Sequence, residues 1–209
     1  MKTPKEPLLK TIPEMSWEDF SRSGFSNATI KGNPIHKLLI QDQTIDTVVF
    51  EGVDFAALSL SKVDFRNVLF RHCSLTNLDF SKRYFGRVRF EGCNLLGSKW
   101  IEAALFDVVF QEGNLAYANF SSASLKGVLF SRSSLKESFF AETEFKDVNF
   151  DESNLSGAEF FKTPLSGIDL SSDVVEGLHC EKESLQGAII APAQAIDFIA
   201  YLGLKIKDE

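Results

Sequence analysis

The sequence predicts an all-β protein: a right-handed parallel β-helix with four sides to each coil and one short C-terminal helix. Two periodicities carry this prediction. Every fifth residue from Ile40 to Ile190 is apolar, and chemically similar residues recur every 20 residues. A period of five fits neither the 3.6-residue period of an amphipathic helix nor the two-residue alternation of a flat strand. Four five-residue units in each coil satisfy both periods.

Each five-residue unit is expected to point two side chains inward. Fourteen of the 20 Phe residues occupy the central position of a unit. The residue two positions earlier is usually small or branched, as in Val48, Ala118 and Ser153. Separation by two places both side chains on the same face of an extended segment. The remaining three residues are mostly polar or Gly, as surface and turn positions require.

The 20-residue period predicts vertical ladders of like side chains in the interior. Val48, Val68 and Val88 form one such series, and the same spacing relates a series of Phe residues at 50, 70, 90, 110, 130 and 150. Stacked coils then pair as short parallel strands that rise about 4.8 Å per coil. Residues 40–190 are therefore expected to form a rod about 36 Å long.

We divide the chain into three segments. Residues 1–19 are expected to form a tail or cap, with Ser16 and Asp19 at the spacing of a helix capping box. Residues 20–190 are assigned to the β-helix, whose first partial coil is predicted from the same five-residue spacing at the positions Phe20, Phe25, Ile30 and Ile35. Residues 191–209 are assigned to a C-terminal helix and dimerisation segment.

The C-terminal segment carries more apolar surface than a cap on one coil needs. Pro192 and Gly203 frame a predicted helix over residues 193–202. An open β-helix end is also a sheet edge that must be covered. We therefore expect a homodimer joined through the C-terminal ends, with the candidate interface residues Ile196, Phe198, Ile199, Leu202, Leu204 and Ile206.

Composition and motifs exclude several classes of function. The 209 residues carry a net charge of −7, which argues against direct nucleic-acid binding. The sequence contains neither a signal-peptide pattern nor an apolar run of membrane-spanning length, so a cytoplasmic protein without membrane contact is expected. Three scattered cysteines and three scattered histidines indicate neither a disulfide framework nor a metal site. With no catalytic or cofactor-binding motif, we predict no enzyme activity, no catalytic residues and no cofactor.

Several inward positions carry unusual residues. Cys73 and Cys93 lie one coil apart and are expected to stack as reduced thiols in the cytoplasm. Arg83, Asp173 and Glu183 occupy positions that are elsewhere small and apolar, so each must swing outward or find a partner. We expect local distortion there, above all near the C-terminal end.

The repeat resembles the consensus A-(D/N)-L-x-x of pentapeptide-repeat proteins, as in residues 118–122, Ala-Asn-Phe-Ser-Ser. The length, the acidity and the endings around residues 165–169 and 190–204 look most like chromosomal Qnr-type quinolone-resistance proteins of Gram-positive bacteria. The resemblance implies a dimer that mimics DNA in width and charge, binds DNA gyrase or topoisomerase IV, and inhibits the enzyme or reduces quinolone poisoning. Some Qnr proteins carry loops tied to drug protection, whereas this register has no insertion. The resemblance therefore favours topoisomerase binding over drug protection.

One side of the rod is the most acidic by outward residue count. It is the side centred on Phe50 and Phe70, and its acidic residues are the candidate partner-binding residues Glu51, Glu91, Glu112, Asp151, Glu152 and Asp169. Arg71, Arg89 and Arg132 lie on the same side. Two hypotheses remain open: a DNA-mimicking ligand of a type II topoisomerase, and a β-helical scaffold for another protein partner, with the charges serving solubility.

Overall fold

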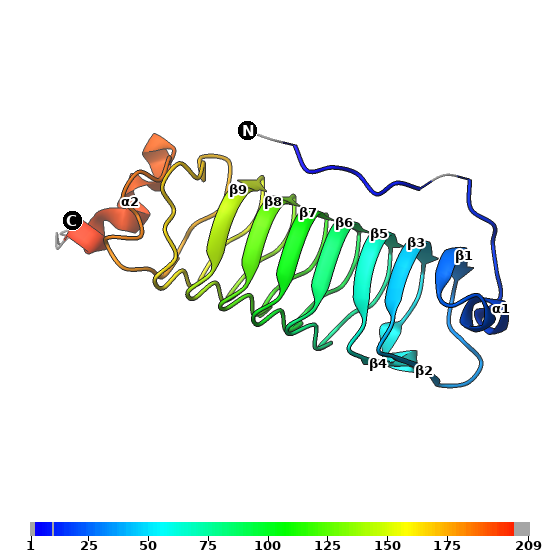
Figure 1. Cartoon of the computed structure of the whole chain (residues 1–209). Helices are drawn as coiled ribbons and strands as arrows, with labels where there is room; N and C mark the ends of the chain where they lie inside the picture. Colours follow the sequence, from blue (N-terminus) through cyan, green and yellow to red (C-terminus); the bar gives the residue numbers. More distant parts are fainter. Residues whose placement is uncertain (1–2, 10, 203–209) are drawn as a thin grey trace.

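The computed structural model describes residues 3–9 and 11–202, and it shows a rod of stacked coils with a helix at each end (Figure 1). The strands are β1 Ser26–Lys31, β2 Leu38–Gln41, β3 Thr44–Glu51, β4 Leu58–Ser61, β5 Asp64–Arg71, β6 Tyr84–Glu91, β7 Ala104–Gln111, β8 Ser124–Ser131 and β9 Glu144–Asp151. The helices are α1 Trp17–Arg22 and α2 Ala195–Phe198, with short 3₁₀ turns η1 Phe55–Ala57, η2 Pro192–Gln194 and η3 Ile199–Leu202.

Strand pairing confirms the predicted fold class. Seven strands form one parallel sheet in the order β1-β3-β5-β6-β7-β8-β9, and β2 pairs with β4 in a second parallel sheet. Every pair is offset by 20 residues, as in Val48↔Val68 and Val68↔Val88. On the sides without long strands, single bridges such as Asn94↔Asn114 keep the same offset. Four five-residue units therefore complete one coil.

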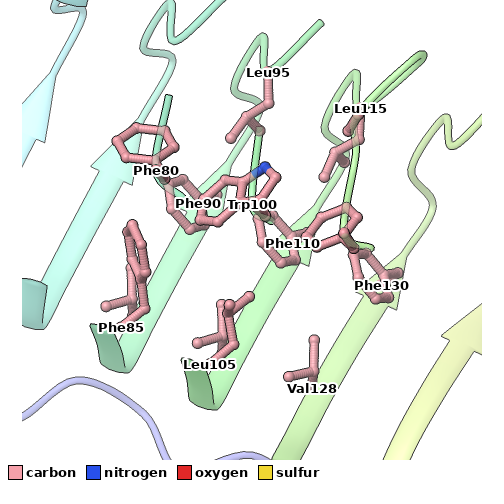
Figure 2. Close-up of a cluster of buried hydrophobic side chains, with 14 of the residues drawn as sticks. Phe80, Phe85, Phe90, Leu95, Trp100, Leu105, Phe110, Leu115, Val128 and Phe130 are labelled. Carbon is pink, nitrogen blue, oxygen red and sulfur yellow. The ribbon is translucent and has the colours of Figure 1, made fainter. Parts of the chain in front are cut away.

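The interior is a continuous apolar column (Figure 2). Phe90 and Phe110 stack with their ring centroids 4.8 Å apart and an interplanar angle of 4°. Phe110 and Phe130 repeat this geometry at 5.0 Å and 5°. All 31 predicted central positions are buried except four that are partly buried, namely Leu60, Phe145, Leu185 and Ile190. The predicted ladders are thus present along the whole rod.

The corners of the coil need an unusual backbone conformation. The third outward residue of most units has a positive φ, for example Asn67 at 49° and Arg87 at 52°. Gly and Asn adopt this left-handed region most readily. Here it also holds Lys, Glu and Arg, because the turn recurs at every corner and the core packing on both sides fixes it.

The N-terminal end departs from the predicted first coil. β1 is a true coil strand, with Ile30 opposite Phe50. Phe20, however, lies on α1 and packs its ring edge-on against Phe50 from outside the coil. Ile35 was expected inside but is 93% exposed. This position was wrongly predicted because residues 32–37 form a loop between β1 and β2 and contribute no strand to either sheet.

The cap at this end follows the predicted spacing. Ser16 accepts a hydrogen bond from the backbone N–H of Asp19 and so begins α1. Residues 13–15 then cover the free edge of β1, because Met15 N–H and Thr29 N–H donate to the carbonyls of Thr29 and Pro13. From there, residues 3–9 run back along the outside of the rod (Figure 1).

The C-terminal helix is shorter than predicted. Residues 193–202 were expected as one helix, but only Ala195–Phe198 is α-helical, with a 3₁₀ turn on each side. Gln194 ties the segment to the last complete coil, since its amide donates to the carbonyls of Leu170 and Asp173 at 2.8 and 2.6 Å. These side-chain bonds anchor the first turn to the coil in place of a regular helix start.

The last coil is distorted, as predicted. Lys162 N–H donates to the side-chain carboxylate of Glu181 at 2.8 Å. One coil earlier the equivalent amide, Glu142 N–H, donates to the backbone carbonyl of Phe161. The ladder therefore loses its regular backbone pairing at this corner.

Candidate protein-binding face

The structure places the six predicted acidic residues along one side of the rod. We call this the Phe50 side and define it as the outward residues that flank the interior ladder from Phe50 to Leu170. Glu51 and Glu91 extend from β3 and β6, and Asp151 ends β9. The ladder brings these strand positions into one line, since Glu51 pairs with Arg71 and Arg71 with Glu91.

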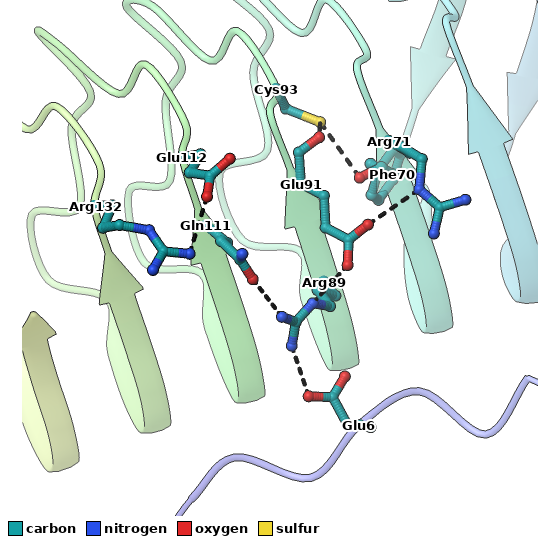
Figure 3. Close-up of polar contacts among 9 residues, drawn as sticks. All are labelled: Glu6, Phe70, Arg71, Arg89, Glu91, Cys93, Gln111, Glu112 and Arg132. Carbon is teal, nitrogen blue, oxygen red and sulfur yellow. Dashed lines mark hydrogen bonds and ion pairs between the residues drawn. The ribbon is translucent and has the colours of Figure 1, made fainter.

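Arginine neutralises the acidic residues in the middle of this side (Figure 3). Glu91 forms ion pairs with Arg71 at 3.1 Å and with Arg89 at 2.8 Å. Glu112 pairs with Arg132 at 2.9 Å. Glu51 lies 4.0 Å from Lys31. Since these pairs are partly exposed, each contributes little to stability, but each cancels local charge.

The acidic residues in the last coils remain free of cationic partners. Within residues 3–9 and 11–202, no Lys, Arg or His side chain pairs with Asp151, Glu152 or Asp169. Asp151 accepts a hydrogen bond from the Ser131 hydroxyl at 3.1 Å. Hydrogen bonds from the side chain and backbone of Ser171 hold the pKa of Asp169 below its ordinary value, so this carboxylate stays charged.

Charge is therefore polarised along the rod. Residues 62–136 contain eleven Lys or Arg and six Asp or Glu. Residues 137–183 contain three Lys or Arg and twelve Asp or Glu. The middle coils are net basic, and the coils next to the C-terminal end hold most of the negative charge. The candidate site contracts to Asp151, Glu152 and Asp169 on the Phe50 side.

The sequence contained a signal for this pairing that residue counting by side missed. Opposite charges 20 residues apart stack on neighbouring coils and meet. Ion pairs at this spacing are Lys31–Glu51, Asp42–Lys62, Arg71–Glu91, Lys82–Glu102, Glu112–Arg132 and Glu142–Lys162. A search for charge partners at separation 20 would have removed Glu91 and Glu112 from the candidates.

The three unusual inward residues behave differently. Glu183 is exposed, and Arg83 donates from its guanidinium to the carbonyl of Ser81 at 3.2 Å. Asp173 stays buried in a ladder above Ser133 and Ser153, and only one of its oxygens has a partner, the N–H of Ser153 at 2.7 Å. Burial, with smaller contributions from Asp151 and Asp169, raises the pKa of Asp173 to about 6.

The cysteine ladder contains free thiols. Cys73 and Cys93 are buried, and their sulfurs lie 3.5 and 3.4 Å from the carbonyls of Phe50 and Phe70. The neighbouring Cys73 sulfur and burial together raise the pKa of Cys93 far above its ordinary value. Cys93 is therefore unreactive, as a packed core residue.

At the C-terminal end, one dimer candidate is used within the chain. Phe198 is buried against the chain's own core, so its assignment as a free interface residue was wrong. Ile196 is 59% exposed and Ile199 is partly buried. The side chain of Leu202, and Leu204 and Ile206 altogether, lie outside the described residues. A cavity of about 570 Å³ opens here, lined by Leu185, Ile190, Ala195, Phe198 and Tyr201 among others.

The described part of the chain offers no arrangement for chemistry. It contains no group of three or more His, Cys, Asp or Glu side chains placed to hold a metal ion. None of the helices it contains is long and apolar enough to cross a membrane. What the geometry provides is a set of long flat faces with fixed spacings, which suits recognition of another macromolecule.

Comparison with known proteins agrees with this description. A family model for the pentapeptide repeat region matches residues 63–140, and a model for pentapeptide repeats in eight copies matches residues 129–167. The full-length structure of QnrB1, a plasmid-mediated fluoroquinolone resistance protein, is 18% identical, with a TM-score of 0.52 and coverage of 92% of this chain and 97% of that chain. A trypsin-treated QnrB1 variant is 20% identical, with a TM-score of 0.51 and coverage of 88% and 92%. No curated protein matches the sequence.

Proposed function

Because the chain belongs to the pentapeptide-repeat family, we propose that it is a non-catalytic scaffold that binds a type II topoisomerase, DNA gyrase or topoisomerase IV, by mimicking duplex DNA. In this proposal the acidic coils near the C-terminal end occupy the place of DNA on the enzyme and inhibit it. Such an interaction takes place where the enzyme meets DNA, in the cytoplasm. A lower sensitivity to quinolones would follow if the bound protein also displaces the drug-stabilised complex.

The observation that carries the proposal is the unpaired negative charge of residues 137–183. Twelve acidic residues and three basic residues lie in little more than two coils. Asp151 and Glu152 project from adjacent positions at the end of β9, and both are exposed. A basic DNA-binding surface would attract such a field over long distances and raise the rate of association.

Reversal of Asp151 and Glu152 to Lys is expected to abolish inhibition of DNA supercoiling by gyrase. Both side chains point outward, so the fold should persist, while the local charge changes by four units. Inhibition by the wild-type protein should also weaken steeply as the ionic strength rises above about 0.1 M, where the Debye length falls below about 10 Å. A supercoiling assay over a series of salt concentrations measures both effects.

The matched control reverses Glu144 and Asp147 to Lys. These residues lie on the same strand, β9, and are equally exposed, but they project from the adjacent side of the rod. The control carries the same net charge as the test variant, so it should still inhibit if recognition depends on the Phe50 side. Equal loss in both variants would mean that net charge alone acts, and equal retention would exclude this site.

The second candidate is a scaffold for a different protein partner. The net basic charge of residues 62–136 favours it, because a DNA mimic would carry negative charge along its whole length. If the wild-type protein neither inhibits supercoiling nor competes with DNA for gyrase or topoisomerase IV at low salt, this second reading replaces the first.

We further propose that the protein acts as a homodimer joined at its C-terminal ends. The exposed side chain of Ile196 and the apolar cavity beside it support this proposal. Burial of both in an interface would remove apolar surface from water and cover the open end of the β-helix.

Ile196→Asp is expected to convert the dimer into a monomer. A carboxylate in an apolar contact is unpaired and desolvated, which opposes association. Light scattering at micromolar concentration measures the mass, and Leu39→Asp is the control, because Leu39 is similarly exposed at the opposite end of the rod. A wild-type protein that is monomeric, or an Ile196→Asp variant that remains dimeric, would contradict this interface.

A further inference from the structure

Two outward apolar residues on the Phe50 side are covered, although their positions face solvent elsewhere. Leu69 and Val109 are 8% and 5% exposed. Ile189 occupies the same place in a later coil and is 50% exposed. An outward position that loses its exposure must be covered by another part of the molecule.

The covering segment is the N-terminal residues 3–9. The N–H of Leu8 donates to Oδ1 of Asn67 at 3.4 Å, and Glu6 pairs with Arg89 at 2.6 Å. These two contacts lie on consecutive coils, on either side of Leu69 (Figure 3 shows the second). Pro4, two residues before Glu6, is itself buried. An extended chain advances about 6.6 Å in two residues, enough to pass one coil and reach the level of Val109.

Arg89 is built into this strip as an anion contact. It replaces the apolar residue that occupies the equivalent place in neighbouring strands, Leu69 in β5 and Val109 in β7. Its guanidinium donates to Glu91, Gln111 and Glu6, so two partners on the rod orient it and leave one edge for the segment. A fixed guanidinium between two apolar patches selects a carboxylate on an otherwise apolar chain.

We propose that this strip is a docking groove for an extended, acidic, proline-containing segment of a partner protein, and that residues 3–9 of the chain occupy it in this structure. The strip consists of Asn67, Leu69, Arg89 and Val109. The segment Pro4-Lys5-Glu6-Pro7 shows the chemistry that fits: proline covers the apolar patches, and a carboxylate meets Arg89. A proline-rich chain loses little conformational entropy when it binds in extended form. The proposal is independent of the topoisomerase proposal.

The test uses full-length protein and a fluorescent peptide with the sequence of residues 2–12. In the Glu6→Lys protein the tethered segment loses its ion pair, so the wild-type peptide should bind by fluorescence anisotropy. The wild-type protein should bind the peptide at least tenfold more weakly, because its own segment competes at high effective concentration. A Glu6→Lys peptide should lose binding, and a Lys5→Glu peptide, altered at an exposed position, should keep it.

A charge exchange supplies the second arm. The Arg89→Glu protein should bind the Glu6→Lys peptide and reject the wild-type peptide. If the peptide does not bind the Glu6→Lys protein at about 1 mM, a very weak affinity, the groove is not a docking site. Equal binding to the wild-type and Glu6→Lys proteins would place the peptide elsewhere and would also overturn the proposal.

Discussion

Phe110→Ala is expected to lower the free energy of unfolding by about 3–5 kcal/mol, the range for large-to-small changes in a well-packed core. Phe110 is fully buried at the centre of the longest Phe ladder. Its ring stacks on Phe90 and Phe130 and meets Trp100 and Phe120 edge-on at 5.7 and 6.1 Å. The loss of these ring contacts adds to the cavity, because coils above and below cannot approach each other without breaking their ladder bonds.

Urea denaturation followed by tryptophan fluorescence measures this effect, since Trp100 lies in the same part of the core. Phe161→Ala is the matched control. Phe161 is exposed on an outward position, so its loss should change stability by less than about 1 kcal/mol. A stable Phe110→Asp protein with an unchanged fold would show that the register of the inward residues is wrong.

The second large effect is a pH dependence of stability that arises from Asp173. Its pKa is raised from 3.8 to about 6 by burial. The folded chain therefore binds a proton more tightly than the unfolded chain does, and the stability falls as the pH rises from about 4 to about 7. A shift of about two pKa units corresponds to about 3 kcal/mol. The unpaired oxygen of this carboxylate has no hydrogen bond to offset the loss of water.

Asp173→Asn is expected to remove this pH dependence. The amide oxygen can still accept from Ser153 N–H, and the side chain has no charge to bury. At pH 7.5 the variant should be more stable than the wild type by up to about 3 kcal/mol, and near pH 4 the two should converge. Asp169→Asn is the control, because the pKa of Asp169 is lowered and its substitution should not produce a gain at neutral pH. Parallel stability curves for Asp173→Asn and wild type from pH 4 to 7.5 would contradict the account.

The fold was predictable from the sequence because each five-residue unit repeats one local geometry. Phe50, Phe70 and Phe90 are inward for the same backbone reason, and the offset of 20 follows once four units close a coil. The prediction failed where this local rule meets an end of the rod. Ile35 has no coil beneath it and faces solvent, and residues 193–202 respond to the side-chain bonds of Gln194 rather than to helix propensity.

The candidate site was less predictable because it depends on pairs of residues. Glu91 and Glu112 were correctly placed outward, but their charge is cancelled by arginines one coil away. The path of residues 3–9 could not be predicted either. This segment has no periodicity, and the partners that fix it, Asn67 and Arg89, are more than 50 residues distant. Tertiary contacts of this kind leave no trace in local sequence patterns.

The separation of charge along the rod also gives the molecule an electric dipole moment nearly parallel to its long axis. Residues 62–136 supply an excess of five positive charges and residues 137–183 an excess of nine negative charges. In the field of a positively charged partner, such a dipole exerts a torque that turns the rod before contact. The chain would then arrive with its C-terminal coils leading, so the first encounter already selects the end that carries Asp151 and Glu152.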